Sequence, residues 1–119
     1  MFLIDGNDVL ASVRHRLVDG LGRLARAYGT PSVVVFDGPS QPELPQGCVR
    51  HGVRVLYAGR ATRADVEILR MVERDARWRA ITVVTSDRVL VRRVVARGAR
   101  TAPAPLLRRA LAHVERDVA

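Results

Sequence analysis

The sequence predicts an α/β domain in three layers, with helices on both faces of a mostly parallel sheet of four or five strands. Three observations lead to this prediction. Short, continuously apolar runs are typical of strands that are buried on both faces. Segments with apolar residues three and four positions apart, which are typical of amphipathic helices, alternate with these runs. Stretches rich in glycine and proline separate the two, and the alternation favours β-α-β units with right-handed crossovers.

The expected elements follow in order along the chain. Apolar runs predict strands at 2–5, 32–37, 53–57 and 81–85, with a short last strand at 99–102. A stripe of apolar residues predicts a first helix that Gly29 ends; its members are Leu10, Val13, Leu17, Leu21, Leu24 and Tyr28. Further helices are expected from about Asp65, over 89–97 and over 106–118. Residues 38–52 contain three prolines and are expected to form an irregular loop.

The composition is that of one basic domain without lysine. A length of 119 residues suits a single domain spanning 1–119 with its own core. The formal charge is +8, which makes a phosphate-rich partner a candidate. A P-loop needs a lysine at the phosphates, so the absence of lysine argues against that class. No apolar run approaches the roughly 20 residues of a membrane helix. With no signal peptide and one cysteine, Cys48, we expect a cytoplasmic protein.

Four aspartates lie where the predicted strands end or lead into a helix. They are Asp5, Asp37, Asp65 and Asp87. Ligands of open α/β sheets bind at the carboxyl ends of the strands, so these carboxylates are expected to meet there and to hold a divalent cation. An all-carboxylate set without histidine or cysteine suits Mg²⁺ or Mn²⁺ rather than zinc. An aspartate after a strand is also a common turn former or helix cap, and on spacing alone capping is the simpler role for Asp65.

Four motifs in order make the chain resemble a known family. They are residues 3–9, 35–38, 63–65 and 84–88, and their order is that of NYN domains of the PIN-like nuclease superfamily, with the YacP-like branch as the most similar. Two positions depart from the family pattern. Asp8 stands where asparagine is expected, and Val66 stands where a second acid often follows.

The resemblance implies a PIN-like, Rossmannoid fold and an endoribonuclease that uses Mg²⁺ or Mn²⁺ to cleave RNA. It implies Asp5, Asp65 and Asp87 as catalytic metal-binding residues, with Asp37 as a further catalytic acid beside them. It also implies four supporting residues, which are Asn7, Asp8, Thr85 and Ser86. Of these, Thr85 and Ser86 are expected to orient the exit of the fourth strand or to contact phosphate.

Arginines near the acids in sequence are candidates for binding the RNA backbone. They are Arg60, Arg63, Arg88 and Arg92. An alternative is that Arg63 and Arg88 neutralise the acidic cluster. Because aromatic residues are only 4% of the chain, a stacking platform for bases is not expected, and recognition should show little base specificity.

Three functions therefore stay open at this point. The first is a metal-dependent ribonuclease acting through metal-activated water. The second, suggested by Asp8, is a non-catalytic RNA-binding NYN domain. The third is a PIN-type toxin or an interaction module. Ribosome association and homo-oligomerisation stay open as further possibilities.

Overall fold

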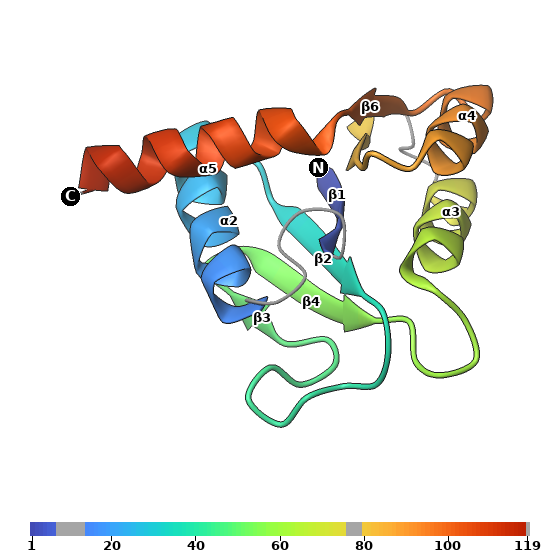
Figure 1. Ribbon diagram of the computed structural model, residues 1–119, viewed down its shortest axis with the longest axis horizontal. Coiled ribbons are helices and arrows are strands. Elements are labelled where there is room, and N and C mark those ends of the chain that lie inside the picture. Colours follow the sequence, from blue (N-terminus) through green and yellow to red (C-terminus); the bar gives the residue numbers. More distant parts are fainter. Residues whose placement is uncertain (7–13, 76–79, 119) are drawn as a thin grey trace.

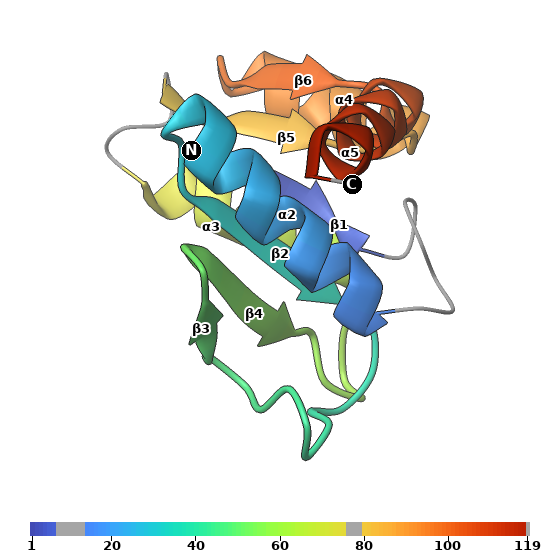
Figure 2. The same cartoon turned by 90° about the vertical axis from the view of Figure 1, so that its left-hand side faces the viewer.

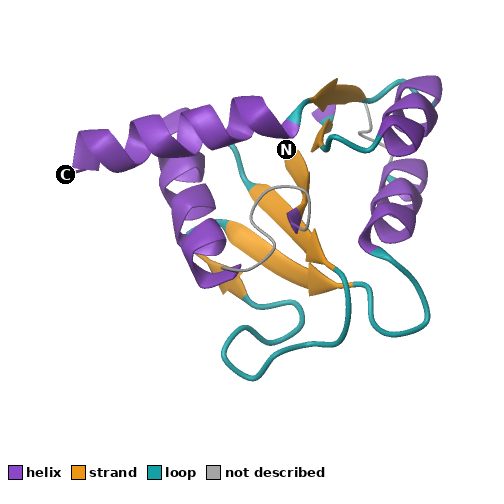
Figure 3. Ribbon diagram, in the orientation of Figure 1, coloured by secondary structure: helices purple, strands orange, loops and turns teal. Residues whose placement is uncertain are grey.

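The computed structural model describes residues 1–6, 14–75 and 80–118 and confirms a mixed α/β fold (Figure 1). Strands and helices alternate along most of the chain (Figure 3). The strands are β1 (Phe2–Asp5), β2 (Ser32–Phe36), β3 (Val49–Arg50), β4 (Val53–Tyr57), β5 (Thr82–Val84) and β6 (Arg100–Ala102). The helices are α2 (Arg14–Tyr28), α3 (Ala64–Arg74), α4 (Arg88–Ala96) and α5 (Ala104–Val118). Most predicted boundaries are correct to within two residues.

The strands form one sheet in the order β3-β4-β2-β1-β5-β6. All neighbouring pairs are parallel except β3 with β4, so the prediction of a mostly parallel sheet is confirmed. The predicted number of strands was too low, because β3 lies within the segment expected to be a loop. It pairs with β4 through a two-residue turn at His51 and Gly52, both with positive φ. Positive φ at both positions is the requirement of a type I′ hairpin turn, whose twist matches that of the strands.

Two cores lie on opposite faces of the sheet because successive strand residues point to opposite sides. On β1, Leu3 belongs to the core beneath α3 and α4, whereas Ile4 belongs to the core beneath α2 and α5. Figure 1 shows these helix pairs on the two sides of the sheet, and Figure 2 shows α2 lying across the first face. The three layers predicted from the sequence are therefore present.

Two side chains differ from their expected environment. Tyr28 was expected on the buried stripe of the first helix, but its side chain is 62% exposed because it is the last residue of α2. Leu44 lies in the predicted irregular loop, yet it is fully buried in the core beneath α2. The loop is thus anchored to the body of the protein. Among the described residues, none of the helices has the length and apolar content that crossing a membrane requires.

Candidate functional site at the carboxyl edge of the sheet

The sheet topology brings the predicted acids to one edge. Strand β1 lies between β2 and β5, so its last residue, Asp5, is flanked by the exits of those two strands. Asp37 follows β2 directly, and Asp87 follows β5 and precedes α4. Asp65 lies in the first turn of α3, which follows β4. Residues Asn7 and Asp8, predicted to support this edge, lie outside the described part of the chain.

Asp5 is held in a buried position at this edge. Its exposed fraction is 6%, and it pairs in register with Val35 of β2. The two-residue period of a strand puts Asp5 on the same face as Leu3, which is the face that α3 and α4 cover. Gly6, the next residue, packs so closely on β2 that a Cβ atom there would lie 2.4 Å from ring carbons of Phe36. The packing of Phe36 therefore requires glycine at position 6.

Asp37 caps the helix that carries Asp65. The backbone N–H of Ala64, the first residue of α3, donates a hydrogen bond of 2.7 Å to Asp37 Oδ1. Arg63, the N-cap residue itself, makes no side-chain capping bond. A carboxylate at a helix N-terminus also interacts favourably with the helix dipole. Asp37 therefore connects the end of β2 to the start of α3 through a hydrogen bond.

Asp87 is the N-cap of α4. Its Oδ1 accepts hydrogen bonds from the backbone N–H groups of Val89 at 2.9 Å and Leu90 at 3.2 Å. Both of these bonds use the same carboxylate oxygen. The sequence pattern of an aspartate three residues before a buried leucine is the usual signature of such a cap.

Thr85 and Ser86 hold the backbone around Asp87 in place. The Thr85 hydroxyl accepts a hydrogen bond of 3.1 Å from the Asp87 backbone N–H, and Thr85 is 1% exposed. The Ser86 hydroxyl accepts one of 3.3 Å from the backbone N–H of Ala104, the first residue of α5. The Thr85 contact orients the backbone at Asp87, and the Ser86 contact ties the exit of β5 to the start of the last helix.

The arginines predicted to bind RNA are all exposed. Arg60, Arg63, Arg88 and Arg92 lie at the surface. Arg63 Nη2 is 3.4 Å from Asp65 Oδ2, so this arginine partly neutralises the acid, as the alternative interpretation proposed. Arg88 is the first residue of α4 and Arg92 lies about one turn later, so both are close to Asp87 along the chain. Phosphate contacts at these positions would therefore lie beside the acidic edge.

The four acids have the right chemistry for a metal ion, but within the described residues they do not form a group of three ligands. The donors are hard carboxylate oxygens, which suit Mg²⁺ or Mn²⁺. Within residues 1–6, 14–75 and 80–118, however, no group of three or more acids, histidines or cysteines is close enough to hold a metal. Mg²⁺ commonly keeps several waters and takes only one or two carboxylates. The chemistry of these donors therefore suits such an ion, but the described residues do not form a closed cage of three carboxylates.

Comparison with known proteins now decides the family. A family model described as the YacP-like NYN domain matches residues 4–119. This chain belongs to the YacP-like NYN domain family. Two crystal structures of Rae1 (YacP) from Bacillus subtilis, one of them of a mutant, have the same fold with TM-scores of 0.78. Their sequence identities are 21% and 22%, over 98–99% of this chain and 76–77% of theirs. No curated protein matches the chain.

Sequence reasoning missed one feature of this NYN domain, which is Arg14 at the start of α2. Its guanidinium lies 4.8 Å from the ring centroid of Phe36 and 5.8 Å from that of Tyr57. It also donates a hydrogen bond of 3.2 Å to the backbone carbonyl of Asp37. In the sequence Arg14 is one of several arginines in a helical stretch, so nothing local distinguishes it.

Tyr57 is a second residue whose environment the sequence did not indicate. It is buried, and its hydroxyl donates a hydrogen bond of 2.8 Å to the backbone carbonyl of Leu44. Burial raises the pKa of the Tyr57 phenol above its ordinary value of 10.0, and the Arg14 guanidinium opposes part of that shift. Tyr57 is therefore unavailable as a stacking surface for RNA bases.

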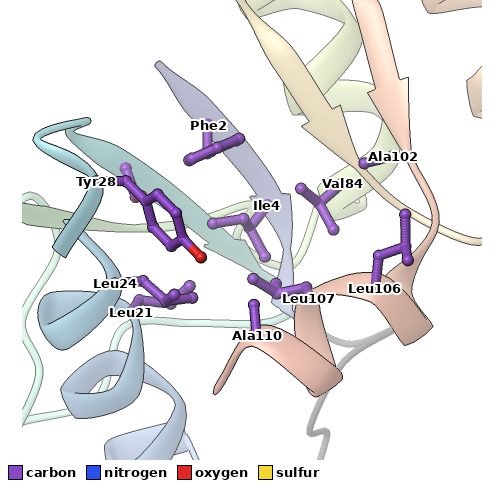
Figure 4. Close-up of a pocket in the computed structure, with 11 residues that line it drawn as sticks. Phe2, Ile4, Leu21, Leu24, Tyr28, Val84, Ala102, Leu106, Leu107 and Ala110 are labelled. Atoms are coloured by element: carbon purple, nitrogen blue, oxygen red, sulfur yellow. The ribbon is translucent and has the colours of Figure 1, made fainter. Parts of the chain in front are cut away.

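The apolar pocket of this NYN domain contains none of the four acids. It lies between α2 and α5 over the sheet, has a volume of about 210 Å³ and is lined by side chains such as Phe2, Leu24 and Leu107 (Figure 4). Few polar atoms line it, so it lacks the groups that phosphodiester chemistry needs. The carboxyl edge therefore stays the candidate site.

Proposed function

We propose that this NYN domain is a metal-dependent ribonuclease that cleaves RNA phosphodiester bonds at the carboxyl edge. The proposal is supported by the positions of Asp5 at the end of β1, Asp65 in the first turn of α3 and Asp87 at the N-cap of α4, in a chain of the YacP-like NYN family. The Rae1 neighbours share the fold.

Asp5, Asp65 and Asp87 would hold Mg²⁺ or Mn²⁺, one or two of them directly and the others through the waters of the ion, with Asp37 in support as the cap of α3. Such an ion, when bound, supplies charge stabilisation at the phosphate and lowers the pKa of a water molecule that attacks it. The burial of Asp5 keeps one carboxylate shielded from bulk water, and the cap contacts of Asp87 fix the orientation of another. Both residues would thus be preorganised for a ligand.

The exposed arginines would bind the RNA backbone on either side of these acids. Arg88 and Arg92 on α4 can contact successive phosphates, and Arg60 lies in the loop before α3. Contacts of this kind position the RNA without reading its sequence. With Phe36 and Tyr57 buried, we expect weak base preference and an affinity that falls steeply with salt concentration.

The test compares isosteric substitutions at the edge with one at the opposite end of the sheet. Asp5→Asn and Asp87→Asn should each lower Mn²⁺-dependent cleavage of RNA by about two orders of magnitude or more. Asn caps helices about as well as Asp, so the free energy of unfolding of the Asp87→Asn variant should change by less than about 0.5 kcal/mol. Asp75→Asn is the matched control, because Asp75 lies at the C-terminus of α3 and should leave cleavage unchanged.

Two outcomes would contradict the ribonuclease proposal. One is a folded parent protein that leaves single-stranded, structured and ribosome-bound RNA intact in both Mg²⁺ and Mn²⁺. The other is cleavage by the two edge variants at the rate of Asp75→Asn.

A second candidate is a non-catalytic RNA-binding domain. It is favoured by the absence of a three-ligand group within the described residues and by the helix caps that occupy Asp37 and Asp87. It predicts RNA binding that weakens with salt and persists in Asp5→Asn and Asp87→Asn. This candidate is eliminated if the parent protein cleaves RNA and the two edge variants do not.

A further inference from the structure

One residue of the acidic edge, Asp37, is held from both helical layers at once. From the α3 layer, the Ala64 backbone N–H donates a hydrogen bond of 2.7 Å to Asp37 Oδ1. From the α2 layer, Arg14 Nη2 donates a hydrogen bond of 3.2 Å to the backbone carbonyl of Asp37. The residue itself is exposed, so without these contacts its side chain would be free to turn into solvent. The two bonds together bridge the end of the sheet.

Arg14 is well placed to act as the fixed side of this bridge. Its half-buried guanidinium lies over the ring of Phe36 at 4.8 Å and near the ring of Tyr57 at 5.8 Å. Phe36 is fully buried and Tyr57 is anchored to Leu44 through its hydroxyl, so both rings form a rigid floor. Arginine is suited to this position because its planar group stacks on rings and donates in fixed directions.

We infer that Arg14 is a positioning residue for the acidic edge, acting through Asp37 on the start of α3. By fixing the peptide of Asp37, it aims that carboxylate at the Ala64 amide and thereby sets the first turn of α3, which carries Asp65. The consequence for cleavage rests on the proposed function. The structural part of the inference does not, and it can be tested alone.

Amide hydrogen exchange at Ala64 is the direct measurement. Arg14→Leu should speed exchange of this amide by about tenfold or more, because the bond to a charged acceptor is loosened. Ile4, in the middle of the sheet, should keep its protection. Arg16→Leu is the matched control, since it removes the same charge from an exposed position on the same helix and should change neither amide.

A double variant separates this role from general stability. If Arg14 acts through Asp37, then Arg14→Leu added to Asp37→Ala should cause no further loss of protection at Ala64. Unchanged exchange at Ala64 in Arg14→Leu would overturn the inference. Equal loss of protection at Ala64 and Ile4 would also overturn it, because Arg14 would then only stabilise the fold.

Kinetics provide the second readout where the parent cleaves RNA. Arg14→Leu should lower kcat with little change in KM, because Asp65 moves while the phosphate-binding Arg88 and Arg92 of α4 stay in place. A higher KM with an unchanged kcat would instead make Arg14 an RNA contact and refute the positioning role. If the parent protein does not cleave RNA, the proposed function fails, yet the exchange experiment still decides whether Arg14 positions α3.

Discussion

Substitution of Gly6 by alanine tests whether the core dictates the residue that follows Asp5. The backbone of Gly6 is not in the left-handed region, so alanine is disfavoured there only by lack of space. An added Cβ would lie 2.4 Å from Phe36 Cδ1 and Cε1 and 3.0 Å from Val34 Cγ2. Phe36 is fully buried and carries Arg14 above its ring, so it has little room to move. We expect a lower stability and a displaced Asp5.

The magnitude follows from the cost of overpacking a core. Extra carbon atoms in a well-packed interior usually cost about 1–3 kcal/mol. A loss of about 2 kcal/mol should lower Tm by roughly 8 °C for a domain of this size. Urea and thermal unfolding followed by circular dichroism measure both quantities. Gly20→Ala is the control, since its new Cβ meets only the end of the Leu111 side chain, and helix propensity gains about 1 kcal/mol.

A double-mutant cycle shows whether the ring of Phe36 is the cause. Gly6→Ala in a Phe36→Leu background should cost at least about 1 kcal/mol less than in the parent, because the ring carbons are gone. The reasoning is refuted if the two costs simply add, or if Gly6→Ala is as stable as Gly20→Ala.

Two further predictions concern the anchored loop. Tyr57→Phe should lower the free energy of unfolding by about 1 kcal/mol at pH 7 through loss of the bond to the Leu44 carbonyl. Because burial raises the pKa of Tyr57 in the folded state, its contribution to stability is fully present below pH 10.0 and is lost as pH rises through the raised pKa. Tyr57→Phe should therefore flatten the fall in stability above pH 10.0. Tyr28→Phe, at an exposed site, should not. Leu44→Ala should lower the free energy of unfolding by about 2–5 kcal/mol in urea titrations, and an equal loss in the control Leu106→Ala, at a 53% exposed site, would contradict the anchoring role.

The acids of the carboxyl edge interact with helix N-termini and with an arginine. Carboxylates that are close together repel one another, and a cation is one way to compensate. Asp37 and Asp87 already interact with the N-termini of α3 and α4, and Asp65 lies near Arg63. These contacts give each of the three carboxylates a favourable partner within the protein. A metal that binds here would therefore add to an arrangement that is already stabilised, and should raise Tm only modestly.

Much of the fold was predictable because its signals are local. Continuous apolar runs identify strands that are covered on both faces, as in residues 33–36 of β2. The helices from α3 onward were predicted from three-four spacing and from residues such as Gly98 that end them. β3 was missed because a two-residue strand carries almost no periodic signal, although the His51-Gly52 turn is a recognisable hairpin feature.

The sequence by itself predicted that the acids lie along one edge, since residues that follow parallel strands lie at the same end of the sheet. It did not determine how each acid is used there. Only the tertiary structure showed that Asp37 caps a helix 27 residues further along the chain, and that Arg14 holds the same residue from the opposite layer. Hydrogen bonds between elements distant in sequence depend on how those elements pack, and no local pattern of residues encodes that geometry.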